Sequence, residues 1–525
     1  MRRRKILYLF FVVGLLSGIV SCGDSDDRNI KEPAEAEMIE QELSGMSAQL
    51  LNAKEVQDFY QSRNYSPIWN HSELRKKFAD ELKKLKQEGL NYKDYHGEEI
   101  MNLIKDESLD AQEQSKAEIL FTDAFFELSD HLLNGKINPS KMYHTFGIPK
   151  EKINTGEILE NISSSEEIEK TLDSLRPQNP HYKGLMASIE EYKKKSTKIT
   201  DIEDGGKIEP GDEDPRIPDI AQRLKELELL SENVQVEGNI YSEEIVASIK
   251  KFQEHQGLAL DGIIGQTTIE GLNIDNVKRY KQIMVNLERW RWFPRELGDH
   301  YVLVNIPDYR VSVIKNGDTL STRRAIVGKE GNETPIFSDT IQYIVINPTW
   351  TVPTSIRDNE IIPAMATNSN YIASHDMEVL DGSGNVVDPS QVTAENAGNY
   401  TFRQRSGARN PLGRVKIIYP NKYAIYLHDT PGRHRFEENT RAISHGCVRV
   451  QDAVGLAAYV LSDQPDWSQE RIEEVINSGE TVQVPVKQKI AVHHFYLTAW
   501  NEDGETKFTH DIYELDDEVY QNLIK

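Results

Sequence analysis

Residues 426–430 read Tyr-Leu-His-Asp-Thr, and residues 441–450 read Arg-Ala-Ile-Ser-His-Gly-Cys-Val-Arg-Val. The stretches at 415–418 and 423–427, which precede and overlap the first of them, are strand-like. The two quoted stretches place His428 and His445 near a single thiol, Cys447. A thiol needs a nearby base to become a nucleophilic thiolate at neutral pH. The pattern therefore predicts a β domain that carries a cysteine nucleophile.

Either histidine is a candidate base for Cys447. His445 lies two residues before the cysteine and would share its face in an extended strand, whereas His428 would reach the sulfur from an adjacent strand. The second arrangement leaves more freedom to place a base against sulfur. Gly446 allows a sharp turn that exposes backbone N–H groups toward an oxyanion, although glycine is also typical of a simple β-bulge.

The rest of the C-terminal half supports a mostly-β domain. Strand-like alternation begins at Tyr301, and the dipeptide Asn316-Gly317 predicts a hairpin turn. We assign the domain to residues 301–465, with an Asn-, Ser- and Gly-rich insertion at about 356–402 that interrupts the strands. Residues 466–525 are interpreted as an extension that packs on this domain and helps to complete it.

The N-terminal half has helical periodicity. An apolar stripe of Phe121, Phe125, Leu128 and Leu132, closed by Gly135, is typical of a long amphipathic helix in a helical domain at residues 46–195. A linker at 196–215, a small three-helix module at 216–274 and a connecting helix at 275–300 follow. The predicted fold class is multidomain α+β.

The first residues predict export. Four basic residues at 2–5 precede an apolar stretch at 6–20, which is shorter than the roughly 18 to 20 residues that cross a bilayer. Ile19-Val20-Ser21-Cys22 resembles the bacterial lipobox. The resemblance implies a signal peptide at 1–21, acylation of Cys22, and a membrane-tethered protein with an acidic tether at 22–45.

The net charge limits the classes of binding partner, and the number of cysteines limits the possible disulfides. A net charge of −24 opposes binding to nucleic acid, and we see no basic patch that would overcome it. The chain has two cysteines, so acylation of Cys22 would leave Cys447 without a disulfide partner.

The spacing of the motif is specific. Fifteen residues, 429–443, separate His428 from Ser444-His445-Gly446-Cys447, and this arrangement resembles the signature of the YkuD-domain L,D-transpeptidases. The sequences at 327–328, 334–335, 347–350 and 410–413 resemble the large YcbB-type branch of that family. Residues 251–273 are similar to a peptidoglycan-binding module.

The resemblance implies a reaction and its central residues. Cys447 would attack the carbonyl between the third and fourth residues of a peptidoglycan tetrapeptide stem and release D-alanine, with His428 as base. An amine of a neighbouring stem would then resolve the acyl-enzyme and form a 3-3 cross-link. Carbapenems would acylate the same thiol, and no cofactor is expected.

The resemblance also assigns the residues around this pair. The backbone carbonyl of Asp429 would orient the imidazole, while His445 and Gly446 would shape the oxyanion pocket. The groove for the stem peptide would be lined by Tyr426, Ser444 and Arg449. Stem peptides and glycan would be the partners of an exported lipoprotein that faces the periplasm, anchored in the outer membrane, with the insertion acting as a lid.

Three alternatives remain open. A zinc hydrolase could use His428, His434, His445 and Cys447 as ligands, but no His-Glu-x-x-His helix motif supplies a base. A papain-like peptidase would place its cysteine before its histidine. A non-enzymatic lipoprotein that anchors peptidoglycan would leave the His-Gly-Cys arrangement unexplained.

Overall fold

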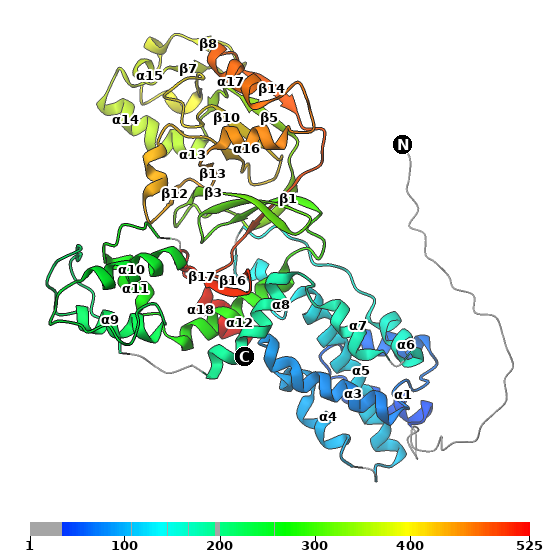
Figure 1. Cartoon of the computed structure of the whole chain (residues 1–525). Helices are drawn as coiled ribbons and strands as arrows, with labels where there is room; N and C mark the ends of the chain where they lie inside the picture. Colours follow the sequence, from blue (N-terminus) through cyan, green and yellow to red (C-terminus); the bar gives the residue numbers. More distant parts are fainter. Residues whose placement is uncertain (1–33, 107, 144, 166, 195–199, 257) are drawn as a thin grey trace. The chain divides into compact units, whose positions relative to one another are not determined.

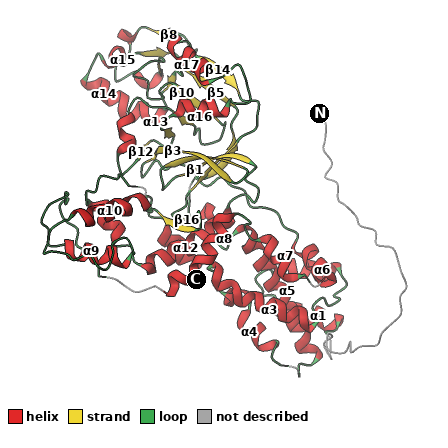
Figure 2. Ribbon diagram, in the orientation of Figure 1, coloured by secondary structure: helices red, strands yellow, loops and turns green. Residues whose placement is uncertain are grey.

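The computed structural model describes residues 34–106, 108–143, 145–165, 167–194, 200–256 and 258–525, so the predicted signal peptide and Cys22 lie outside the described residues. The chain forms two compact units. One contains residues up to Leu82, Lys93–Glu127 and Gly156–Glu169, and the other contains Lys83–Tyr92, Leu128–Thr155 and Lys170–Lys525. Every described strand belongs to the second unit (Figures 1 and 2). Among these residues, no helix has both the length and the apolar character needed to cross a membrane.

The helices of the N-terminal half bury aromatic side chains. Trp69 is fully buried, and its ring centroid lies 5.3 Å from those of Phe78 and Phe121. The predicted stripe is buried along one long helix. The helix ends at Asn134, and Gly135 follows it in the left-handed conformation, with φ 82°. The helices are α1 (Ala36–Met46), α2 (Ala53–Ser62), α3 (Ser72–Lys84), α4 (Gly97–Leu103), α5 (Ala111–Asn134), α6 (Thr155–Ser165), α7 (Ile168–Leu175) and α8 (Pro180–Lys194).

The predicted acidic tether is wrong for its last part. Helix α1 buries Ile39, Leu43 and Met46, although most of it lies within the predicted tether at 22–45. Because these residues are spaced by four and three positions, they form one apolar face among acidic neighbours. The prediction failed because it relied on the average composition of residues 22–45, which does not show how the apolar residues are spaced.

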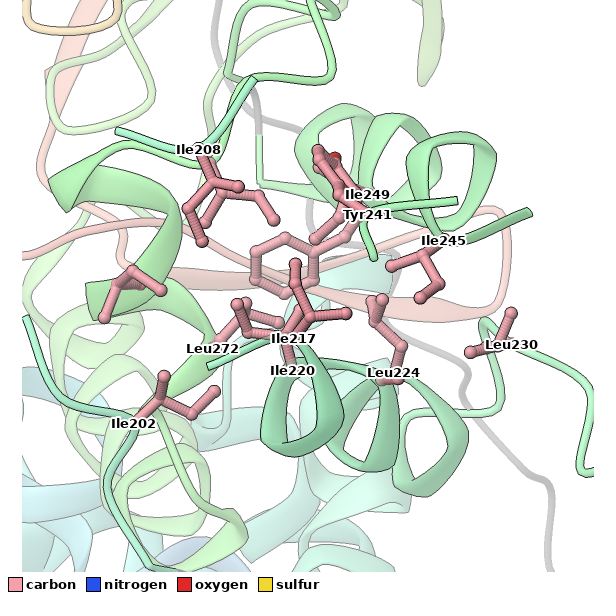
Figure 3. Close-up of a cluster of buried hydrophobic side chains, with 14 residues drawn as sticks. Ile202, Ile208, Ile217, Ile220, Leu224, Leu230, Tyr241, Ile245, Ile249 and Leu272 are labelled. Atoms are coloured by element: carbon pink, nitrogen blue, oxygen red, sulfur yellow. The ribbon is translucent and has the colours of Figure 1, made fainter. Parts of the chain in front are cut away.

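The small module between the two halves is helical, as predicted. It contains α9 (Ile217–Glu226), α10 (Glu243–His255) and α11 (Gln266–Leu272). Isoleucines, leucines and Tyr241 from these helices and their loops converge on one core (Figure 3). The Tyr241 hydroxyl, 2.6 Å from the Gly262 carbonyl oxygen, ties the core to the turn before α11.

One detail of this module corrects the prediction. The predicted linker at 196–215 supplies Ile202 and Ile208 to the core, and Ile208 exchanges two backbone hydrogen bonds of 3.0 Å with Ile264. The described part of the linker, residues 200–215, therefore belongs to the module, because apolar residues within a Gly- and Asp-rich stretch pack into its core. In the turn before α11, Gly262 has a positive φ of 74°, whereas Gly265 is extended with φ −99°.

Eleven strands of the described residues form one sheet: β1 (His300–Asn305), β2 (Arg310–Lys315), β3 (Asp318–Gly328), β4 (Phe337–Thr340), β5 (Tyr343–Ile346), β10 (Val415–Ile418), β11 (Leu427–His428), β12 (Ala442–Ser444), β13 (Val448–Val450), β14 (Val482–Pro485) and β15 (Ala491–Phe495). Their order is β14-β5-β10-β11-β13-β3-β2-β1-β15-β4, and β12 pairs with β3. The predicted hairpin joins β2 to β3, and both Asn316 and Gly317 have the positive φ values, 54° and 89°, that its tight turn requires.

The insertion forms a layer with its own core. Strands β6 (Trp350–Thr351), β7 (Met377–Leu380), β8 (Val386–Val387) and β9 (Thr401–Gln404) pair in the order β6-β9-β7-β8. The helical segments include α13 (Thr354–Ile356), the π-helical turn η4 (Arg357–Ile361), α14 (Ile362–Thr367) and α15 (Tyr371–Ser374). Val379, Ala397 and Phe402 are fully buried in this core. We call residues 350–404 the insertion subdomain, because β6 begins before the predicted start at 356.

The C-terminal extension is part of the sheet and does not only pack against it. β14 forms one edge, and β15 lies between β1 and β4, parallel to β1. This stretch also contains α17 (Gln469–Ser478), β16 (Ala499–Glu502), β17 (Glu505–Phe508) and α18 (Asp516–Leu523), and it follows α16 (Ala453–Val460). The apolar alternation of β15 made a strand predictable, but its pairing with a strand about 190 residues earlier was not.

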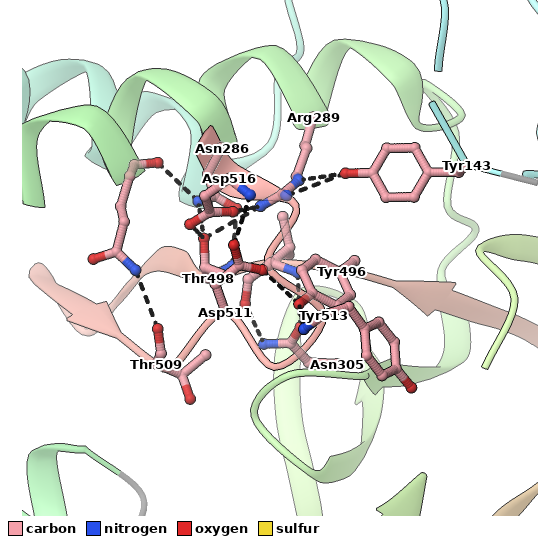
Figure 4. A network of polar contacts seen from close by, with 12 residues as sticks. Tyr143, Asn286, Arg289, Asn305, Tyr496, Thr498, Thr509, Asp511, Tyr513 and Asp516 are labelled. Carbon is pink, nitrogen blue, oxygen red and sulfur yellow. Dashed lines mark hydrogen bonds and ion pairs between the residues drawn. The ribbon is translucent and has the colours of Figure 1, made fainter. Parts of the chain in front are cut away.

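The connecting helix α12 (Asn276–Trp292) shares a buried polar network with the C-terminal residues (Figure 4). Fully buried Arg289 contacts Asp516 at 2.5 Å and the Tyr143 hydroxyl at 3.1 Å. The Thr498 hydroxyl donates to the same Asp516 carboxylate at 2.7 Å. We call Arg289, Tyr496, Thr498, Asp511 and Asp516 the tail network.

Candidate active site

The parallel pairing of β11 and β13 brings His428 and Cys447 onto neighbouring strands. Leu427 pairs with Val448 and His428 with Arg449. The N–H of Val448 donates to the carbonyl oxygen of Tyr426 at 3.2 Å, and Cys447 immediately precedes β13. This is the adjacent-strand arrangement that the sequence favours for a base and its thiol.

His428 is oriented by a backbone carbonyl. Its side chain is buried, and Nδ1 lies 2.6 Å from the carbonyl oxygen of Asp429. Because a carbonyl oxygen only accepts, Nδ1 carries the ring proton and Nε2 keeps a free lone pair. Burial lowers the pKa of His428 to about 3, and the charge of Arg449 acts in the same direction. The imidazole is therefore neutral at pH 7 and able to accept a proton.

Cys447 is partly buried, and its protonated form is favoured at rest. Sγ lies 3.8 Å from the carbonyl oxygen of Ala424. Burial raises the pKa of the Cys447 thiol, while hydrogen bonding from Tyr426 and the charges of Lys416 and Arg449 lower it. The resting pair is thus a thiol beside a neutral imidazole, with two cations near enough to favour a thiolate once it forms.

A tight turn sets the backbone before the thiol. Gly446 has φ 107°, a conformation that residues with a Cβ rarely adopt. The Ser444 hydroxyl donates to the Cys447 carbonyl oxygen at 2.7 Å and accepts from the Gly446 N–H at 3.1 Å. Ser444 is buried, so its hydroxyl is committed to this turn, whereas the sequence prediction placed it in the substrate groove.

The structure adds two residues to those that the sequence suggested. Lys416 pairs with His428 across β10 and β11, and its Nζ lies 3.7 Å from the centroid of the Tyr426 ring. A lone lysine in the otherwise apolar strand Val415–Ile418 was a signal that could have been read. Ala424 has φ 56°, and the Asn421 side chain, which accepts from the Ile425 N–H at 3.1 Å, fixes its loop beside the thiol.

His445 points toward the insertion subdomain. Its Nε2 lies 2.6 Å from Oε1 of Glu360 in η4, and both side chains are partly exposed. The carboxylate of Asp429 contacts Arg414 at 3.0 Å. Of the two candidate bases, His428 therefore has its ring fixed by the sheet, and His445 is held by a residue of the insertion.

The four residues of the zinc alternative are not brought together. In the ranges that the structure describes, no three His, Cys, Asp or Glu side chains are grouped so as to hold a metal ion. His434 lies in the short helical turn Arg433–Glu437 and is exposed.

Three segments match known domain families. Residues 54–188 match a scaffold domain, residues 213–272 a putative peptidoglycan binding domain, and residues 299–484 the YkuD family of L,D-transpeptidase catalytic domains. A curated relative, a putative L,D-transpeptidase of Haemophilus influenzae, is 35% identical over 242 residues. That match covers 46% of this chain and 49% of the relative, so the aligned region spans about half the relative's length.

Solved L,D-transpeptidases are more distant. The structure from Stackebrandtia nassauensis is 14% identical with a TM-score of 0.22, covering 58% of this chain and 98% of that chain. The structure from Mycobacterium smegmatis is 13% identical with a TM-score of 0.18, covering 37% and 58%. TM-scores this low do not establish a shared whole-chain fold.

Proposed function

We propose that this protein, whose residues 299–484 match the YkuD family of L,D-transpeptidase catalytic domains, cross-links peptidoglycan through an acyl-enzyme on Cys447. The donor is a tetrapeptide stem, the leaving group is its terminal D-alanine, and the product is a 3-3 cross-link. The fixed tautomer of His428, with a free Nε2 on the strand beside Cys447, is the observation that carries this proposal.

Acylation begins with proton transfer from the thiol. His428 Nε2 takes the proton as Sγ bonds to the stem carbonyl carbon, and the carbonyl π electrons move onto oxygen. Collapse of this tetrahedral oxyanion re-forms the carbonyl and breaks the C–N bond to D-alanine, whose nitrogen receives the proton from His428. Lys416 and Arg449 stabilise the negative charge that passes through sulfur.

The oxyanion needs donors that are already in place. The N–H of Cys447, which follows the Gly446 turn, is our candidate donor, and His445 completes the pocket when its contact with Glu360 opens. An amine of a second stem then attacks the thioester, releases Cys447 and forms the cross-link, with His428 now accepting the proton of the amine. Tyr426 and Arg449 border the groove in which the donor stem lies.

Product analysis tests this function. Purified muropeptides are incubated with the soluble chain from residue 34 onward and analysed by mass spectrometry. We expect free D-alanine and a dimer joined through two third-position residues from the wild-type chain, and neither product from Cys447→Ala. Release of a stem by hydrolysis alone, or cross-linking by Cys447→Ala, would contradict the proposal.

The other segments fit a location in the cell envelope. We propose that the module that matches a peptidoglycan binding domain raises the local concentration of stems. Removing residues 200–274, which include its whole core, should weaken sedimentation with insoluble peptidoglycan, and unchanged sedimentation of a folded deletion would contradict this role.

We also propose that acylated Cys22 tethers the protein to a membrane that faces the periplasm. We propose that this membrane is the outer membrane. Cys22→Ala should move the protein from the membrane fraction to the soluble fraction. A variant that stays with membranes would contradict lipid attachment at this residue.

A further inference from the structure

The peptide unit before the thiol is held from its buried side by Thr334. The Thr334 hydroxyl donates to the carbonyl oxygen of Gly446 at 2.8 Å and accepts from the N–H of Gly328 at 2.9 Å. Thr334 is only 2% exposed, so neither contact is shared with solvent. The carbonyl oxygen of Gly446 therefore has one fixed direction.

That direction also fixes the next N–H group. The peptide bond between Gly446 and Cys447 is planar and trans, so its N–H points opposite to its carbonyl oxygen. A donor for an oxyanion must already be aimed before charge develops, because reorienting it during the reaction costs free energy. By holding the Gly446 carbonyl, Thr334 sets the aim of the Cys447 N–H.

Thr334 is itself positioned by Tyr513, which comes from the C-terminal tail. The Tyr513 hydroxyl donates to the carbonyl oxygen of Gly328 at 2.6 Å and accepts from the N–H of Thr334 at 3.2 Å. Burial raises the pKa of Tyr513, so the hydroxyl stays protonated and keeps its donor role. Tyr513 thus joins the end of β3 to the residue that holds Gly446.

The tail network holds Tyr513 in turn (Figure 4). The backbone N–H of Tyr513 donates to the Tyr496 hydroxyl at 2.9 Å, and that hydroxyl donates to Asp511 at 2.6 Å. The two tyrosine rings stack with centroids 5.4 Å apart. The backbone N–H of Asp516 donates to the Asp511 carboxylate at 2.6 Å. A continuous set of buried and partly buried contacts therefore runs from α12 and the tail to the peptide unit of the nucleophile.

The loop between Gly328 and Thr334 has little room to adjust. A Cβ on Gly328 would lie 2.1 Å from the carbonyl oxygen of Asn332, so the chain turns back tightly on itself. The N–H of Lys329 donates to the carbonyl oxygen of Ser444 at 3.0 Å. The loop is thus fixed to the His-Gly-Cys turn at two points, and a shift at Tyr513 would reach that turn.

We propose that Tyr513 is a positioning residue for the acylation step, acting through Thr334 to aim the Cys447 N–H at the oxyanion. This inference rests on the proposed function, because it assumes that Cys447 is acylated. Its role is separate from that of His428, which governs the thiol proton. Loss of Tyr513 should therefore slow attack on a carbonyl without changing the reactivity of the thiol itself.

The test compares two reactions of the same thiol in the same protein. Acylation by a carbapenem passes through an oxyanion, whereas alkylation by iodoacetamide displaces iodide and forms none. For Tyr513→Phe we expect acylation to be slower by about 10-fold, less than the roughly 10² to 10³ that losing a donor outright costs. The alkylation rate and its pH profile should match those of the wild-type chain.

Three further variants control for general damage. Thr334→Val removes the hydroxyl and should slow acylation at least as much as Tyr513→Phe, whereas Thr334→Ser retains the hydroxyl and should stay within about 3-fold of wild type. Tyr241→Phe removes another buried tyrosine hydroxyl, but one that contacts the Gly262 carbonyl oxygen in the small helical module. It should leave both reactions unchanged.

The outcomes separate this inference from the proposed function. If Tyr513→Phe slows both reactions equally, or if Thr334→Ser is as slow as Thr334→Val, the positioning role is wrong. Should Tyr513→Phe fail to fold, the Thr334 pair decides alone. If carbapenem does not acylate the wild-type thiol at all while iodoacetamide does, the proposed function fails and the inference fails with it.

Discussion

The two sides of Cys447 are held in different ways. On the buried side, His428, Thr334 and Tyr513 make short contacts within the sheet and the tail. On the exposed side, the His445–Glu360 contact joins side chains with 37% and 52% of their surface accessible. Groups that must be aimed before the reaction lie on the first side, and groups that a substrate must pass lie on the second. Under the proposed function, the buried side would hold the reacting groups in place and the exposed side would admit the stem.

The largest effect should follow from removing the buried base. His428→Ala should lower the acylation rate by about 10² to 10⁴ at pH 7, the usual cost of losing general base catalysis. Because burial lowers the pKa of His428 to about 3, the base form persists at all pH values above that. The wild-type rate should therefore stay flat from about pH 5 to 8 and show no acid limb near 6.5, the ordinary histidine value.

The variant should respond to pH in the opposite manner. The pKa of Cys447 is raised by burial, so the thiolate is scarce at pH 7 and grows by about 10-fold per pH unit below that pKa. His428→Ala should recover part of its rate as the pH rises, measured by stopped-flow acylation, while His445→Ala should not. If only His445→Ala recovered its rate at alkaline pH, the base would be His445 and our assignment of His428 would be wrong.

The next effect concerns the stability of the fold and should come from the tail network. Arg289→Met leaves Asp516, whose side chain is 14% exposed, as a largely buried carboxylate without its cation, and breaking a buried pair in this way typically costs about 3 to 5 kcal/mol. We expect the free energy of unfolding to fall by that order in urea titrations followed by fluorescence. The double variant Arg289→Met/Asp516→Leu should recover much of the loss, since it removes the unpaired charge, and no recovery would mean that the pair itself is not responsible.

The smallest effect should come from the exposed side. Glu360→Gln keeps the shape of the side chain but removes its charge, and exposed ion pairs contribute only about 0 to 1 kcal/mol. The acylation rate should change by less than about 5-fold, and hydrogen exchange in residues 350–404 should become faster. A loss of rate as large as that of His428→Ala would show that the His445–Glu360 contact is needed for acylation itself and does not only hold the insertion subdomain in place.

Local patterns in the sequence were sufficient for much of the fold. The Asn316-Gly317 turn follows from a dipeptide that tolerates positive φ, and the stripe along α5 follows from helical spacing. Both depend only on neighbours along the chain. The segments that were assigned wrongly, α1 and the stretch around Ile208, have few apolar residues among many charges, and the cores that receive them lie elsewhere in the sequence.

The site shows the same division. The sequence allowed His428 to be paired with Cys447, because the two residues lie close along the chain and a nucleophilic thiol needs a base. Lys416, Glu360 and Tyr513 reach the site from separate strands, the insertion and the tail. Their contacts depend on strand order and on a loop closed over 179 positions, between Thr334 and Tyr513. No local pattern encodes these contacts.

The most direct test of the central claim is the mass of the intact protein after brief exposure to a tetrapeptide-stem muropeptide. Quenched in acid, the wild-type chain should carry one adduct equal to the donor muropeptide minus D-alanine, and digestion should place it on the peptide that contains Cys447. Cys447→Ala should carry none. An unmodified wild-type chain that still yields 3-3 cross-links, or an adduct on any other residue, would contradict the account.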